Sequence, residues 1–157
     1  MKLIYILFLS LFLASPVFSH CQIPCGIYDD KAAFSELRLH TETIHKSIDM
    51  ITALSADDIA EKSVDQKAQH DQQFTRWIIN KEQHASKIQH LVSDYFLTQR
   101  IKSTDKRDRF LYRRYLDKLA AAHQIIFYAM KSKQTLELEN ITKLNEFIDE
   151  LEKNLDR

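Results

Sequence analysis

Glycine and proline are almost absent from this chain, and their scarcity most constrains its fold. The 157 residues include one glycine and two prolines. Sheets and loop-rich folds depend on these residues at their turns. The composition therefore predicts long helices joined by short connections.

Apolar residues recur at steps of three and four in four segments, the spacing that places them on one face of an α-helix. The segments start after Tyr28, near Phe74, at Ser103 or Thr104, and at about Gln134. The expected core positions are Phe34, Leu37, Ile44, Ile48, Ile51, Ile78, Ala85, Ile88, Val92, Tyr95, Leu111, Tyr115, Leu119, Ala122, Ile126, Ala129, Ile141, Leu144, Ile148 and Leu151. Four amphipathic helices predict an all-α fold, an antiparallel up-down four-helix bundle.

Polar residues between these segments predict some of the helix ends. Asp29 or Asp30 is placed to cap the first helix, and the run from Ser55 to Asp58 resembles a capping box with Asp in place of Glu. The stretch 59–73 is polar and gives no clear helical prediction.

Charge excludes one class of partner. The chain carries 22 basic and 22 acidic residues, so its formal net charge is zero. No basic excess is present to release counterions from a nucleic acid, and we expect no nucleic-acid partner.

The first 19 residues have the pattern of a cleaved export signal. Lys2 precedes a nearly unbroken apolar run, Leu3–Ala14, and Val17 and Ser19 occupy the positions that signal peptidase reads before a cut. The run is too short to span a bilayer as a helix. We expect residues 1–19 to be removed, the chain to be periplasmic or secreted, and no membrane attachment to remain. An uncleaved N-terminal anchor is the alternative.

A cut after Ser19 would make His20 the new N-terminus and create a set of metal donors. The His20 amine and the Cys21 amide nitrogen can close one five-membered chelate ring, and the Cys21 nitrogen and thiolate a second. Cys25 can supply another thiolate, and the His20 imidazole can reach an axial position. Planar nitrogen and sulfur donors suit Ni(II) or Cu(II) better than Zn(II), which prefers a tetrahedron.

Pro24 and Gly26 flank the second cysteine of this segment. Proline restricts how the chain can return towards the N-terminus. Gly26, the single glycine, suits a position that needs a positive φ angle or a close backbone approach. The competing interpretation of the segment is a Cys21–Cys25 disulfide, because two cysteines in an exported chain normally pair.

The stretch HCQIPCGIYD, which starts at His20, resembles the nickel hook of nickel superoxide dismutases, whose N-terminal pattern is H-C-x-x-P-C-G-x-Y. Lys81–Gln83 and Ser93–Phe96 are similar to the K-E-Q and S-D-Y-F segments of that family's second helix. Family members are small four-helix bundles that assemble as hexamers. The resemblance implies a hook at 20–28, a bundle at 29–157, one nickel ion per subunit and a homohexamer.

The resemblance also implies an activity. The chain would be an antioxidant enzyme, an oxidoreductase that converts superoxide to O2 and H2O2 while its nickel cycles between Ni(II) and Ni(III). The metal ligands would be His20, Cys21 and Cys25, with the His20 imidazole bound axially in the oxidised state.

Four further residues have roles implied by the resemblance. Glu36 would orient the hook histidine through a hydrogen bond. Tyr28 and Tyr95 would line the approach to the metal and order water or superoxide. His84 stands where some family members have an arginine that supports the glutamate. Histidine is shorter and not always charged, so we expect the contact to Glu36 to differ in this chain.

Two other functions compete with this interpretation. An exported helical bundle with a Cys21–Cys25 disulfide, which binds a metal or a partner, is equally compatible with the composition. A di-iron bundle needs two Glu-x-x-His steps, and Glu42–His45 is the single copy here. The remaining histidines, His40 among them, were expected to be ordinary surface or core residues.

Overall fold

The computed structural model describes residues 28–156, and every regular element in this part of the chain is helical. The signal segment and the hook residues before Tyr28 lie outside the described residues. The elements are α2 (Asp30–Ser55), α3 (Val64–Leu91), the π-helix η1 (Val92–Arg100), α4 (Arg109–Gln134) and α5 (Glu139–Leu155).

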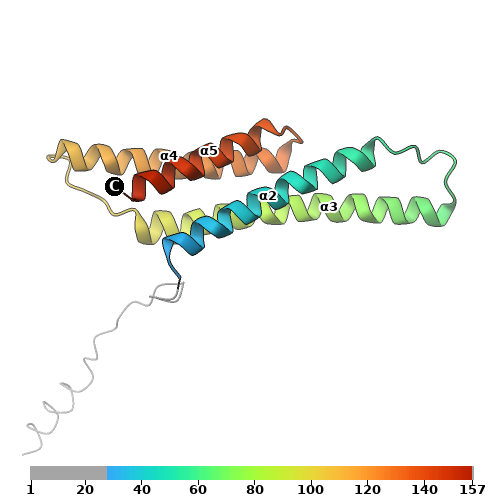
Figure 1. Cartoon of the computed structure of the whole chain (residues 1–157), viewed down its shortest axis with the longest axis horizontal. Coiled ribbons are helices and arrows are strands. Elements are labelled where there is room, and N and C mark those ends of the chain that lie inside the picture. Colours follow the sequence, from blue (N-terminus) through green and yellow to red (C-terminus); the bar gives the residue numbers. More distant parts are fainter. Residues whose placement is uncertain (1–27, 157) are drawn as a thin grey trace, which may run out of the picture.

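The helices form a closed ring of antiparallel neighbours. Helix α2 packs against α3 and α5, and α4 packs against α3 and α5. Figure 1 shows the α2–α3 hairpin reaching well past the α4–α5 hairpin at the end where α2 and α3 are connected. In agreement with this overhang, the buried residues of α3 begin only at Lys81. The predicted four-helix bundle is confirmed.

Most of the predicted core positions are buried. The periodic positions of α2 and α5 are all inside, and Ala85, Ile88 and Ala129 join them from α3 and α4. Leu111 is an exception, because 44% of it is exposed near the open end of α4. In the described part of the chain, no helix has an apolar stretch long enough to cross a membrane.

The predicted start of α2, with an aspartate as its cap, is confirmed. Asp29 has an extended backbone, and its carboxylate accepts a hydrogen bond from the Ala32 amide at 2.8 Å. This contact satisfies an amide that has no partner within the helix.

Three other predicted ends were wrong. Helix α3 begins in the polar stretch, at a capping box formed by Ser63 and Gln66, whereas Ser55 is the last residue of α2. Helix α4 is capped by Asp108 rather than by Ser103 or Thr104. Helix α5 begins at Glu139, because α4 continues through residue 134. For α3 and α4 another polar residue nearby supplies the cap, a choice that local sequence does not distinguish, whereas α5 begins after Leu138 without a side-chain cap.

A buried lysine links α3 to the end of α4. Lys81 is 4% exposed, and its ammonium donates to the carbonyl oxygens of Ser132 and Lys133, both at 2.7 Å, and of Thr135 at 3.3 Å. The last carbonyl groups of a helix lack internal partners and carry partial negative charge. Lys81 therefore caps α4 from a neighbouring helix and fixes the two hairpins against each other.

Candidate active site

The first described residue, Tyr28, is anchored to the second turn of α2. Its hydroxyl donates a hydrogen bond to Glu36 Oε2 at 2.6 Å. Burial of the phenol, reinforced by the nearby carboxylate, raises the pKa of Tyr28 well above its usual value. Tyr28 is therefore a neutral phenol whose proton is committed to Glu36.

Tyr95 comes to the same place from η1. Its ring meets the Tyr28 ring edge to face, with centroids 5.2 Å apart and an interplanar angle of 86°. Its hydroxyl donates to Asp30 Oδ1 at 2.7 Å. The structure thus brings together, at the point where α2 begins, the two tyrosines that were predicted to share one site.

The π-helical geometry of η1 has a local cause. Thr98 donates to the carbonyl of Ser93, and Gln99 donates to that of Asp94, in each case five residues back. These bonds favour a turn that is wider than an α-helical one. Adjacent residues Tyr95 and Phe96 are both buried. Short π-helical segments are frequent at functional sites.

Asp30 joins Tyr95 to the end of η1. Its carboxylate accepts from Tyr95 and from the Arg100 guanidinium, whose Nε and Nη2 lie at 2.6 and 2.5 Å. Partial burial works against the charged carboxylate, but the bonds from Arg100 and Tyr95 outweigh it and lower the pKa of Asp30. Burial and, to a smaller extent, the hydrogen bond to Asp30 raise the pKa of Tyr95 to about 12.

On the opposite side of Glu36 lies a histidine that sequence reasoning missed. His40 is one helical turn beyond Glu36 and 6% exposed, and its Nε2 is 3.6 Å from Glu36 Oε1. His84 does not contact Glu36 directly; its Nδ1 lies 3.1 Å from His40 Nδ1. The i,i+4 spacing of Glu36 and His40 was the available signal, because it places both on one helix face.

Both histidines favour the neutral form. Burial lowers the pKa of His40 and outweighs the opposing effect of Glu36. Burial also lowers the pKa of His84, and Lys87 adds to that shift. Glu36 thus lies between a neutral phenol, Tyr28, and a neutral imidazole, His40, and each of these contacts a second neutral ring, Tyr95 or His84.

The expected metal ligands His20, Cys21 and Cys25, with Pro24 and Gly26, lie outside the described residues. Between residues 28 and 156 no group of three or more histidine, cysteine or acidic side chains could hold a metal ion. Glu42 and His45 therefore form no such group there.

The donor chemistry expected of a chain that begins at His20 fits nickel. Two thiolates with an amine and an amide nitrogen would form a planar set, and square-planar geometry suits Ni(II) or Cu(II). Tyr28 lies three residues after Cys25. The described site is therefore the part of the bundle to which those donors are covalently joined.

Comparison with known proteins identifies the family. The sequence model described as nickel-containing superoxide dismutase matches residues 15–156, which include both the cysteine segment and the whole bundle. Neither the search of curated proteins nor the search of solved structures returns a match. This chain belongs to the nickel-containing superoxide dismutase family, and it is an enzyme that uses nickel to convert superoxide to dioxygen and hydrogen peroxide.

Proposed function

We propose that the nickel is bound at the processed N-terminus by the amine and imidazole of His20, the backbone nitrogen and thiolate of Cys21, and the thiolate of Cys25. Removal of residues 1–19 creates the amine that this ligand set needs. When bound, nickel supplies a one-electron couple that can accept an electron from one superoxide and return it to another. The chain's own residues must hold the ligands, limit access to the metal and transfer protons.

The observation that carries this proposal is the anchoring of Tyr28. Three residues of chain span at most about 11 Å, so Cys25 cannot lie farther than that from Tyr28. Tyr28 is itself tied to Glu36, and its ring packs against Tyr95. A ligand set that ends at Cys25 is thus tethered beside a carboxylate and two tyrosines.

Glu36 is proposed to orient the His20 imidazole. Imidazole ligands of metals commonly donate their second N–H to a carboxylate, which fixes ring orientation. One Glu36 oxygen accepts from Tyr28 and the other faces His40, and a carboxylate has about four lone-pair sites. Acceptor capacity therefore remains for His20.

Tyr28 and Tyr95 are proposed to line the approach of superoxide. Both hydroxyl protons are committed to carboxylates, so each phenol oxygen can still accept a hydrogen bond. Water is a donor that fits these acceptors, and an ordered water could in turn donate to superoxide. The two rings also limit the size of molecules that pass them.

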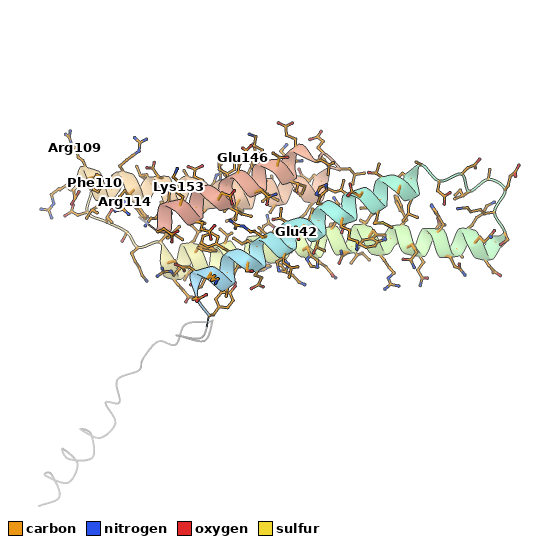
Figure 2. All side chains as sticks on the ribbon, in the orientation of Figure 1. Glu42, Arg109, Phe110, Arg114, Glu146 and Lys153 are labelled. Carbon is orange, nitrogen blue, oxygen red and sulfur yellow. The ribbon has the colours of Figure 1, made fainter. Side chains whose placement is uncertain are left out.

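A homohexamer is proposed from family membership, and exposed apolar residues support association. Phe110 is 70% exposed at the outer end of α4, where the Arg114 guanidinium lies 5.8 Å from its ring (Figure 2). Leu39 and Ile79 are also largely exposed, on α2 and α3. Exposed apolar groups of this kind suit a subunit interface. Export to the periplasm or the medium remains the proposed location, on the pattern of residues 1–19.

The test of the hook is an alanine inserted between Ser19 and His20. The added residue would move the free amine away from the His20–Cys21 chelate, so we expect loss of nickel and of dismutase activity with unchanged helicity. An alanine inserted between Glu61 and Lys62, in the α2–α3 connection, is the matched control and should keep both. Full activity in the first variant, with its N-terminus verified, would exclude the proposed ligand set.

A further inference from the structure

His40 presents an unusual arrangement for a buried polar side chain. Its Nε2 is buried, and no group in the described residues is within hydrogen-bond distance of it. The nearest acceptor is Glu36 Oε1, at 3.6 Å. A buried imidazole nitrogen without a partner is costly, so a role for this position beyond packing is expected.

The other nitrogen of His40 faces a second imidazole. His40 Nδ1 and His84 Nδ1 are 3.1 Å apart, and the rings are nearly perpendicular, at 86°. A hydrogen bond at this distance needs one nitrogen to carry a proton and the other to accept it. The two rings cannot both be protonated at Nδ1 without losing the contact.

Glu36 decides which nitrogen donates. If His40 carried its proton on Nδ1, its Nε2 lone pair would face the Glu36 carboxylate and be repelled. If His40 carries it on Nε2, that N–H points to the carboxylate and Nδ1 accepts from His84. The arrangement therefore favours the Nε2–H tautomer of His40 and the Nδ1–H tautomer of His84.

We propose that His40 is a positioning residue for the superoxide reaction: its Nε2–H faces Glu36 Oε1 across 3.6 Å and attracts the carboxylate electrostatically, while His84 holds the His40 ring through the shared Nδ1 contact. This inference rests on the proposed role of Glu36 towards the hook. His84 thereby supports the carboxylate indirectly, through a second imidazole.

The same geometry limits the charge of the pair. One added proton can reside on either ring with the Nδ1 contact intact, but a second would place two N–H groups against each other. The charged or titratable groups that face the pair are Glu36 on α2 and Lys87 on α3, and these oppose each other in their effect on His40. The pair thus takes up one proton, and a cationic His40 would draw Glu36 away from its other partners.

Long-range proton–nitrogen NMR of the reduced, nickel-loaded protein tests the pair directly. At pH 8 we expect His40 to be protonated on Nε2 and His84 on Nδ1, and on acidification of the folded protein the two rings to gain no more than one proton in total. His45→Gln is the matched control, because His45 forms an exposed i,i+4 pair with Asp49 on the same helix; it should leave both signals unchanged. An Nδ1-protonated His40 at pH 8, or two independent protonations by pH 5, would overturn the proposal.

Kinetics tests whether the pair matters to the reaction. We expect His40→Gln to lower the rate roughly 10-fold at neutral pH, in the range found for partners of metal ligands. The wild-type rate should fall as the pair gains its proton, and the variant should lack that step because glutamine does not titrate. His45→Gln should match the wild type at every pH.

Glu36→Gln separates the proposed role of Glu36 from the positioning role of His40. If it loses activity while His40→Gln keeps the wild-type rate and pH profile, the positioning role of His40 is wrong and the proposed function stands. If Glu36→Gln also keeps the wild-type rate, the proposed role of Glu36 fails, and the inference falls with it.

Discussion

Both tyrosines of the site donate their hydroxyl hydrogen bonds to carboxylates. Tyr28 donates to Glu36 and Tyr95 to Asp30, at 2.6 and 2.7 Å. Superoxide is an anion and needs donors, so neither hydroxyl can bind it without first breaking one of these bonds. The tyrosines are better suited to hold the carboxylates and accept from water than to bind superoxide directly.

Tyr28→Phe tests this division of roles. The substitution removes the bond to Glu36 and leaves the ring, so we expect a rate reduced roughly 10-fold with nickel retained. Stopped-flow decay of superoxide, with nickel content by elemental analysis, is the measurement. Tyr128→Phe is the control, because the Tyr128 ring stacks on Phe147 between α4 and α5. An unchanged rate in Tyr28→Phe would show that Tyr28 contributes its ring alone.

The residues of the site were predictable to different degrees. Tyr28, Tyr95 and Glu36 were proposed from the resemblance, and the structure places them side by side. His40 was missed because its role depends on a contact with His84, which is 44 residues away in the sequence. A lone histidine on an otherwise apolar helix face looks like an ordinary core residue until the facing helix is known.

Among the helices, α3 and its continuation η1 could be predicted only in part from local sequence patterns. The N-terminal half of α3 is polar because it extends past α4 and α5, so no periodic apolar face marks it. The π-helix depends on side chains that bond to carbonyl groups five residues back, a contact that apolar spacing does not reveal. The bundle itself was predictable, because its packed helices repeat apolar residues with the helical period.

Lys81 connects the two hairpins through three hydrogen bonds to carbonyl groups at the end of α4. Lys81→Met keeps the length and the apolar stem but leaves carbonyl groups at the end of α4 without their donor. We expect the free energy of unfolding to fall by about 2 kcal/mol, the magnitude typical of a hydrogen-bonded charged group. Urea denaturation measures it.

The same substitution at an exposed position provides the control for that loss. Lys87 lies on α3 and is exposed, and Lys87→Met should change stability by less than about 0.5 kcal/mol. Equal losses in the two variants would mean that the end of α4 does not depend on the Lys81 ammonium.

For the whole molecule, acid should lower the free energy of unfolding in two pH ranges. The pKa values of His40 and His84 are lowered in the folded state, so the unfolded chain binds protons first as the pH falls below 6.5. The pKa of Asp30 is also lowered, so its ion pair with Arg100 loses its contribution below about pH 3.8, the ordinary pKa of aspartate. These three groups should therefore lower the free energy of unfolding as the pH falls through each range.

Urea denaturation across pH 3 to 8 measures this dependence. His40→Gln should reduce the loss that begins below pH 6.5, whereas His45→Gln should leave the curve unchanged. A loss of stability below pH 6.5 that is as large in His40→Gln as in the wild type would contradict the buried, neutral state of His40.

The most direct test of the central claim is the native mass of the protein exported from nickel-supplied cells. We expect subunits that begin at His20, one nickel ion per subunit and an assembly of six. These values would establish the cleavage site and the metal together. A nickel-free chain lighter by two hydrogens would indicate a Cys21–Cys25 disulfide, and a different N-terminus would remove the amine ligand; either result would contradict the nickel hook.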